Sequence, residues 1–497
     1  MKRFVACFMA VLMISLTACG AAQPKEKIDG VKIALSDEEI TVDGSAVSND
    51  TSDAVYAAHD IVFYLAGQGI AYGEGESADE HTQLEADAHT VVHITKPGTY
   101  IVSGQLSAGQ IAVDLGKNAA SDPNAVVTLV LSGVDITCQV APAIIFYNVY
   151  ECGNKDNAAK DVDTSAAGAN IVIADGSENT VNGSYVAKIY KSCTLSEDGS
   201  EVLESKKLHK YDGAVYSRMS MNVSGGEKNN GILNINAENE GLDSELHLTV
   251  NGGNINIISG DDGINTNEDG VSVTTINGGD IHITINGKQG EGDGIDSNGW
   301  LVINGGRVIA EACATSGDAG IDSDMGIYIN GGTVIASGNM LDSIVGSRQN
   351  YAVFTFAKQQ EGKGQVYTLK NDGGETVMEA APSNAFTYLI LSAPELQAVD
   401  DTLWLGDTQM SGTVIESDRG GKMQLDGQQM PQMPEGQQMP GMPMGEAPSG
   451  NNQQPPEIPD GTDGMKGNIN EQPQNEVIGE KSTTFAIMAG GNYFRVD

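Results

Sequence analysis

The sequence predicts an all-β protein, a right-handed parallel β-helix of about 26 residues per coil with a small C-terminal β cap. Glycine supplies 62 of the 497 residues and only 5% are aromatic, which favours short strands and tight turns over a helical bundle. From residue 31 to about 345, apolar and polar residues alternate with period two and helical periodicity is weak. A glycine-rich triplet recurs there at spacings of 27, 26, 27 and 26 residues, which is the pattern of a solenoid.

The repeated triplet marks one corner of each coil. It starts as Ser-Gly-Gly at Ser224 and continues as Asn-Gly-Gly at Asn251, Asn277, Asn304 and Asn330. About 26 residues accommodate three short strands and three turns, stacked on the next coil at roughly 4.8 Å. We expect the glycines to allow positive φ and the stacked asparagines to form a hydrogen-bonded column. The residues expected to point into the core are Val250, Ile255, Ile276, Ile281, Ile303, Val308, Ile329 and Val334.

The first residues have the pattern of an export signal. Lys2 and Arg3 precede an apolar run that is too short to span a membrane permanently. The Leu-Thr-Ala-Cys sequence that follows resembles the lipobox of bacterial lipoproteins. This resemblance implies that Cys19 carries a lipid, and that the protein is extracellular and anchored to the bacterial cell membrane by that lipid only. The alternative is an ordinary secretory signal with a chance cysteine.

Composition shifts divide the chain. Residues 413–480 are rich in Met, Pro, Gln and Gly and cannot form a core, so we expect disorder there. In an exported protein, the cysteines after the signal are expected to form structural disulfides; these are Cys138, Cys152, Cys193 and Cys313. The expected organisation is a lipoprotein signal peptide (1–18), a tether (19–30), the β-helix (31–349), the β cap (350–412), the disordered insert (413–480) and a terminal strand (481–497).

Charge limits the partners. With 67 acidic and 27 basic residues, the net charge is 27 − 67 = −40, which excludes a nucleic-acid binder held by phosphate contacts.

The acidic turns predict a calcium site. In stacked coils, Asp243, Asp296 and Asp322 fall into one column, with Asn265 in the second coil. Two carboxylates about 5 Å apart repel by roughly 3 kcal/mol at an effective dielectric constant of 20, so a cation that bridges the coils is expected. A set made only of oxygen ligands suits Ca²⁺; the alternative is a solvated acidic face. The predicted ligands are Asp243, Asp261, Asp262, Asn265, Glu291, Asp293, Asp296, Asp318, Asp322 and Asp324.

The segment 128–137 (TLVLSGVDIT), the Asn-Gly-Gly coils and the acidic Gly-Ile-Asp-Ser turns together resemble a known family. It is the calcium-associated, β-helical carbohydrate-binding family of bacterial surface lipoproteins, which is similar in fold to pectate lyases. The resemblance covers roughly residues 90–412, and residues 147–165 and 413–480 depart from the pattern. It implies binding of cellulose and pectin-like polysaccharide of the plant cell-wall type, and we expect this binding to be non-catalytic.

Three outward residues are the candidate sugar contacts. Trp300 and Tyr328 fall on adjacent coils, roughly 8 Å apart, where their rings can stack on sugars or pack under a loop. Arg307 also points outward. One alternative is a calcium-dependent pectate lyase with Arg218, Arg307 or Lys288 as the base, although an arginine among acids more often forms ion pairs. A second alternative is a structural surface or adhesion protein.

Overall fold

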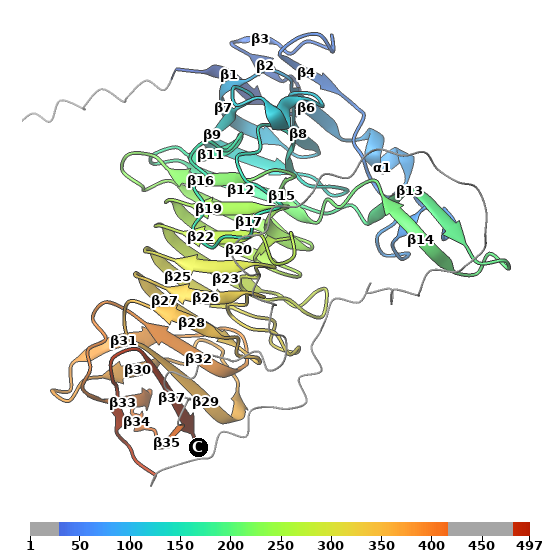
Figure 1. Cartoon of the computed structure of the whole chain (residues 1–497). Helices are drawn as coiled ribbons and strands as arrows, with labels where there is room; N and C mark the ends of the chain where they lie inside the picture. The colour runs from blue at the N-terminus through green and yellow to red at the C-terminus, as the bar shows by residue number, and fades with distance from the viewer. Residues whose placement is uncertain (1–28, 416–480) are drawn as a thin grey trace, which may run out of the picture.

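A computed structural model describes residues 29–415 and 481–497 of the chain. Almost all of its regular structure is β-strand, and the strands form an elongated stack (Figure 1). The single α-helix of the described residues, α1 (Gln83–Asp87), begins at a capping box between Thr82 and Glu85. No helix in the described ranges is long and apolar enough to cross a membrane. The prediction of an all-β protein is therefore confirmed.

Two columns of parallel strands flank the Asn-Gly-Gly corners. The strand before each corner pairs with its counterpart in the next repeat, and so does the strand after it. The first column contains β9 (Val127–Thr137), β11 (Ala169–Ile173), β16 (Met221–Gly225), β19 (His247–Val250), β22 (Val273–Ile276), β24 (Trp300–Ile303), β26 (Gly326–Ile329) and β28 (Ile344–Ser347). The second contains β9 again, β12 (Glu178–Gly183), β17 (Ile232–Ala237), β20 (Asn254–Ser259), β23 (Asp280–Ile285), β25 (Arg307–Glu311) and β27 (Thr333–Gly338).

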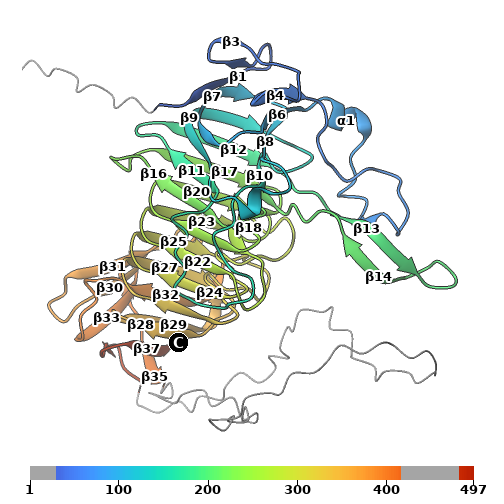
Figure 2. The same cartoon turned by 45° about the horizontal axis from the view of Figure 1, so that its top comes forward.

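A third column of parallel strands belongs to a separate sheet. It contains β6 (Thr90–Ile94), β8 (Gly109–Asp114), β10 (Ile144–Asn148), β15 (Gly213–Ser217), β18 (Glu240–Ser244) and β21 (Ile264–Thr266). Single bridges from Ile264 to Ile295 and from Ile295 to Ile321 extend this column beyond β21. The chain visits the three columns in turn, as from β18 through β19 to β20, and the rungs lie one above another in Figure 2.

The remaining N-terminal strands cover that end of the stack and project from its side. They are β1 (Val31–Leu35), β2 (Thr41–Val42), β3 (Ser45–Ala46), β4 (Val55–Ala58), β5 (Gly73–Glu74), β7 (Gly98–Leu106), β13 (Lys188–Leu195) and β14 (Val202–Lys207). β13 and β14 form an antiparallel hairpin that extends sideways from the stack (Figure 1).

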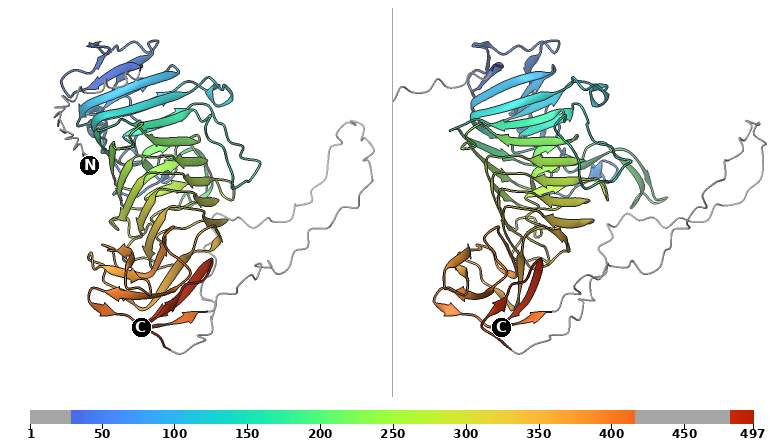
Figure 3. Two further views of the ribbon diagram at one scale, coloured as in Figure 1. Left: turned by 90° about the vertical axis from the view of Figure 1, so that its left-hand side faces the viewer. Right: turned by 60° about the vertical axis from the view of Figure 1, so that its left-hand side comes forward.

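Mostly antiparallel strands cover the other end (Figure 3). They are β29 (Tyr351–Gln360), β30 (Tyr367–Lys370), β31 (Thr376–Ala380), β32 (Phe386–Ser392), β33 (Asp400–Leu405), β34 (Thr408–Gln409), β35 (Gly412–Ile415), β36 (Phe485–Ala486) and β37 (Gly491–Val496). β32 pairs with β27, the last strand of the second column, and β37 lies between β29 and β35. Residues 1–28 and 416–480, and with them Cys19 and most of the predicted insert, lie outside the described residues.

The corner chemistry follows the sequence prediction. The amides of Asn277, Asn304 and Asn330 each donate to the side-chain oxygen of the preceding asparagine at 2.9 Å, beginning with Asn251. The second glycine of each of the four Asn-Gly-Gly corners has positive φ, as at Gly253 (101°). The eight apolar residues expected in the core are fully buried. The asparagine column and the inward-facing residues are therefore confirmed.

The disulfide prediction is wrong. All four described cysteines are free thiols. Cys138 follows β9 and Cys313 follows β25, and four strands of the second column separate those elements. Five steps of about 4.8 Å place them roughly 24 Å apart, whereas a disulfide needs Cα atoms within about 7 Å. The stack separates residues that belong to different repeats.

One buried acid in the C-terminal strands predicts a dependence of stability on pH. Burial, together with Asp372 and Asp400, raises the pKa of Asp401 to about 7, and neither of its side-chain oxygens has a partner. Because the folded-state pKa exceeds the ordinary value of 3.8, its contribution to stability is full below about pH 4 and is lost as the pH rises through 7. We expect Asp401→Asn to raise the melting temperature at pH 8 and to leave it unchanged near pH 4. A shift of equal size at both pH values would contradict this assignment.

Candidate functional site

A row of polar residues runs along the third column. The β15–β18 and β18–β21 registers pair Tyr216 with Asp243 and Asp243 with Asn265. The bridges at Ile295 and Ile321 then place Asp296 and Asp322 next in the row, because each follows a bridged isoleucine. The preceding isoleucines are fully buried in the core, so the row lies on the opposite side of the backbone. The fold thus brings four of the predicted metal ligands into one line.

A second acidic row lies three residues before Asp243, Asn265 and Asp296. Backbone hydrogen bonds align these turns, since the Gly241 amide donates to the Asp262 carbonyl and the Gly263 amide to the Asp293 carbonyl. The residues of the row are Glu240, Asp262 and Asp293. Asp262 Oδ1 accepts from the Asp293 amide at 2.7 Å. The two rows meet where Asn265 Nδ2 donates to Glu240 Oε1 at 2.9 Å.

Three carboxylates of these rows converge. One oxygen each of Asp293, Asp296 and Asp322 lies within 4.8 Å of the others. Burial raises the pKa of Asp296 to about 7, with Asp322 and Asp324 contributing, and burial beside Asp322 raises that of Asp293 well above its ordinary value. These shifts show that three negative charges are unfavourable here without a counterion.

Three buried polar residues beside this triad have side-chain oxygens without hydrogen-bond partners. Glu240 Oε2, Asp243 Oδ2 and Asn265 Oδ1 are buried and accept no hydrogen bond. Burial raises the pKa of Glu240 and of Asp243 well above the ordinary value, with acidic neighbours including Asp212 adding to the shift. Buried oxygens in native proteins are nearly always satisfied, so three acceptors without a donor fit a hard cation held by oxygen ligands.

The other predicted ligands lie around the edge of the two rows. Burial and the charges of Glu291 and Asp318 raise the pKa of Asp261 to about 6. Asp318 Oδ2 accepts from the Gly292 amide at 2.7 Å, and Glu291 and Asp324 are exposed.

Two acids of the site are missing from the predicted ligands. Glu240 occupies the position of Asp262 and Asp293 in its own turn, and Asp342 follows Asp322 with an unpartnered Oδ2. Burial next to Asp322 raises the pKa of Asp342 to about 7. The Leu341-Asp342-Ser343 sequence repeats the acidic turn and was the signal that could have identified Asp342.

The predicted sugar contacts lie on the first and second columns. Trp300 and Tyr328 are half-buried on adjacent strands, offset by two residues in register. The ammonium of Lys160 lies 5.1 Å from the Tyr328 ring centroid and covers that ring. Arg307 forms an ion pair with Asp280 at 3.0 Å. Among the described residues, Arg307 is therefore ion-paired and the Tyr328 ring is covered by a cation, whereas no cation lies over the Trp300 ring.

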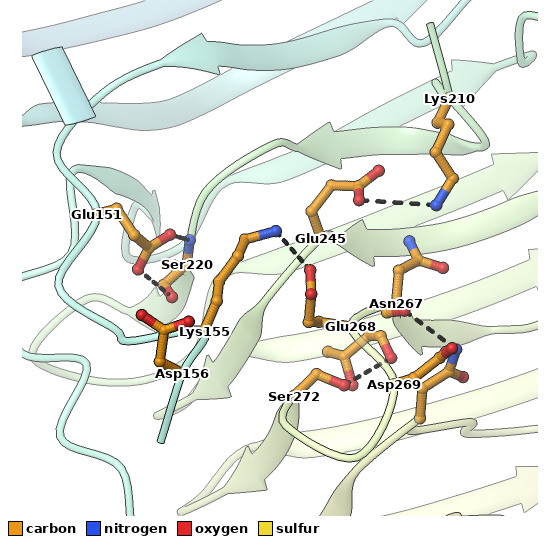
Figure 4. Close-up of polar contacts among 12 residues, drawn as sticks. Glu151, Lys155, Asp156, Lys210, Ser220, Glu245, Asn267, Glu268, Asp269 and Ser272 are labelled. Carbon is orange, nitrogen blue, oxygen red and sulfur yellow. Dashed lines mark hydrogen bonds and ion pairs between the residues drawn. The ribbon is translucent and has the colours of Figure 1, made fainter. Parts of the chain in front are cut away.

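The loop that connects β10 and β11, residues 149–168, runs along the outside of the stack. Lys155 pairs with Glu268 at 2.5 Å, and Glu151 accepts from the Ser220 amide and hydroxyl at 2.7 Å (Figure 4). Further along, the Thr164 hydroxyl contacts Asn222 and Thr249 at 2.7 Å. The sequence showed only that part of this loop departs from the family pattern, and its contacts reach strands of several repeats.

The chain belongs to a family of carbohydrate-binding proteins. The family model described as "Carbohydrate-binding domain-containing protein" matches residues 88–353, more than half of the chain. A carbohydrate-binding domain-containing protein of Acetivibrio thermocellus is 28% identical over 261 residues, which are 52% of this chain and 65% of that protein. The chain therefore spans somewhat less than two thirds of the length of this relative.

Among solved structures, the chain is similar to the polysaccharide lyase-like protein from C. thermocellum, in its gadolinium derivative. The sequence identity is 19%, the alignment covers 64% of this chain and 97% of that chain, and the TM-score is 0.33.

Proposed function

We propose that the protein is a non-catalytic, extracellular polysaccharide-binding lipoprotein, anchored to the cell membrane by a lipid on Cys19. The family supports carbohydrate as the ligand, and the expected glycans are cellulose and pectin-like chains. The three columns of parallel strands support a closed, right-handed parallel β-helix as the scaffold. Such a scaffold presents a long, regular face to an extended polymer.

Calcium is proposed to link the acidic turns. The observation that carries this proposal is the group of buried, unpartnered oxygens on Glu240, Asp243 and Asn265. Asp293, Asp296 and Asp322 offer carboxylate oxygens close enough together to share one ion. A bound Ca²⁺ supplies positive charge between repeats, and the residues of this chain hold it and so join successive turns.

The lyase alternative needs a free basic side chain that can remove a proton from the sugar. Arg307 is held by Asp280, which supports its role as an ion-pair partner. If the protein only binds, polygalacturonate incubated with it and Ca²⁺ will show no rise in the absorbance of unsaturated uronate. A rise that is lost in Arg218→Ala, Arg307→Ala or Lys288→Ala would make the protein an enzyme.

Binding to cellulose tests the proposed function. In a pull-down with insoluble cellulose, we expect the wild type to bind and Trp300→Ala to bind about twofold to tenfold more weakly, because a ring that stacks on sugar is lost. Trp404→Ala is the matched control, since Trp404, the second of the two tryptophans, lies in the C-terminal strand β33. Equal binding by all three proteins would remove Trp300 from the site, and no binding by the wild type would contradict cellulose binding.

A further inference from the structure

A cavity of about 340 Å³ opens where β10, β15 and β18 end. Four cationic side chains and one carboxylate, that of Glu245, line the cavity. The cations are Lys155, Lys207, Lys210 and Arg218. Three of these cations pair with Glu74, Glu245 and Glu268, so the cavity has a formal charge of 4 − 3 = +1 in a protein with a net charge of −40. An unpaired cation at the mouth of a cavity attracts anions in spite of the acidic surface.

The fold assembles this wall from distant parts of the chain. The registers of β10, β15 and β18 place Tyr147, Arg218 and Glu245 side by side, since Phe146 pairs with Ser217 and Ser217 with Ser244. Lys207 is the last residue of β14 in the projecting hairpin, and Lys210 lies in the segment that follows the hairpin. Lys155 comes from the loop 149–168, beside Glu268 in Figure 4.

Arg218 is the cation available to a ligand. Lys155 and Lys207 pair with Glu268 and Glu74, and Lys210 lies 3.8 Å from Glu245. Within the described ranges the exposed guanidinium of Arg218 forms no ion pair, and it lies 5.2 Å from the Tyr147 ring centroid. A planar guanidinium with free N–H donors matches the paired oxygens of an acid group.

Aromatic rings form the rest of the wall. The Tyr211 ring meets the Tyr147 ring edge to face, with the centroids 5.9 Å apart. It also packs against the Tyr216 ring at a tilt, with the centroids 5.2 Å apart. Tyr211 and Tyr216 are buried, so their rings pack behind the half-buried ring of Tyr147 and support the wall of the cavity. The Tyr216 hydroxyl donates to Glu245 Oε1 at 2.9 Å, which orients that carboxylate as an acceptor for a sugar hydroxyl.

We propose that this cavity binds an anionic sugar unit of the glycan, with its acid group on Arg218 and a sugar hydroxyl on Glu245. The inference rests on the proposed carbohydrate-binding function and adds to it a charge-selective subsite. A volume of 340 Å³ is at the lower end of small-molecule pockets, which suits a short stretch of glycan. The acid group is a uronate carboxylate or a sulfate ester, since both present paired oxygens.

Calorimetric titration of the full chain in saturating Ca²⁺ tests the subsite. The probes are a short oligogalacturonate, the same oligomer with its carboxylates reduced to alcohols, and a sulfated oligosaccharide of equal length. We expect one charged probe to bind at least about tenfold more tightly than the reduced oligomer. Arg218→Gln is expected to remove that preference, Arg218→Lys to keep part of it, and Lys117→Gln, an exposed cation outside the cavity, to leave it unchanged.

The outcomes separate the subsite from the wider function. A charged probe that binds Arg218→Gln as tightly as the wild type would overturn the subsite, while its binding would still support carbohydrate recognition. Equal affinity of the wild type for charged and reduced oligomers would also overturn it. A wild type that binds none of the three glycans would contradict the subsite, and failure to bind cellulose as well would contradict the function. Matching melting temperatures establish that each variant is folded.

Discussion

Removal of Ca²⁺ with EDTA is expected to lower the melting temperature by several degrees, and added Ca²⁺ is expected to restore it. A ligand that binds only the folded state adds RT ln(1 + [L]/Kd), or about 2.7 kcal/mol at a hundredfold excess over Kd. One kcal/mol corresponds to roughly 2–4 °C in a large domain. The buried, unpartnered oxygens of Glu240, Asp243 and Asn265 are the reason to expect an effect of this size.

Mg²⁺ is the matched control for this measurement. It demands octahedral geometry and retains its waters, so it should restore less of the melting temperature than Ca²⁺. An unchanged melting curve after verified removal of calcium would contradict the role of the ion as a structural link. Equal rescue by both ions would indicate general screening of the acidic rows.

Asp296→Asn is expected to change stability in opposite directions with and without calcium. In excess Ca²⁺ the substitution removes one negatively charged ligand from the triad that Asp296 forms with Asp293 and Asp322. The ion should then bind more weakly and the melting temperature should fall. In EDTA at pH 8 the same substitution removes a repelling charge from a carboxyl group whose pKa is raised to about 7, so the melting temperature should rise by a few degrees. Thermal melts of both proteins under both conditions measure the reversal.

Asp407→Asn provides the comparison. Asp407 is exposed in the turn after β33, and its substitution removes the same charge at a position far from the triad in sequence. It should leave the melting temperature nearly unchanged under both conditions. If Asp296→Asn were destabilising with and without calcium, its carboxylate would have an ordinary structural role.

The repeats made the scaffold predictable. The asparagine column and the buried residues around each corner follow from local spacing, since neighbouring repeats place equivalent residues side by side. The same spacing predicts that Asp243, Asn265, Asp296 and Asp322 align, and the strand register and the bridges at Ile295 confirm it. Periodicity is enough wherever a residue contacts its own counterpart in the next repeat.

Contacts between unlike parts of the chain were not predictable. The cationic cavity needs Lys155 from a loop, Lys207 from a hairpin, Lys210 from the segment after it, and Arg218 directly after β15. No repeat relates these segments, so spacing carries no information on their approach. The cover that Lys160 places over Tyr328 was missed for the same reason. The disulfide prediction relied on the export signal alone and not on the separation that stacking imposes.

The loop 149–168 also bears on how the molecule unfolds. In a stack where each repeat contacts only its neighbours, repeats open one after another from a free end. Here the loop joins β16 and β19 through Thr164, the turn before β22 through Lys155, and β26 through Lys160. Opening any repeat that the loop contacts therefore also disturbs the contacts of the loop with more distant repeats. The middle of the stack should behave as one cooperative unit in hydrogen exchange, with similar protection from β16 to β26.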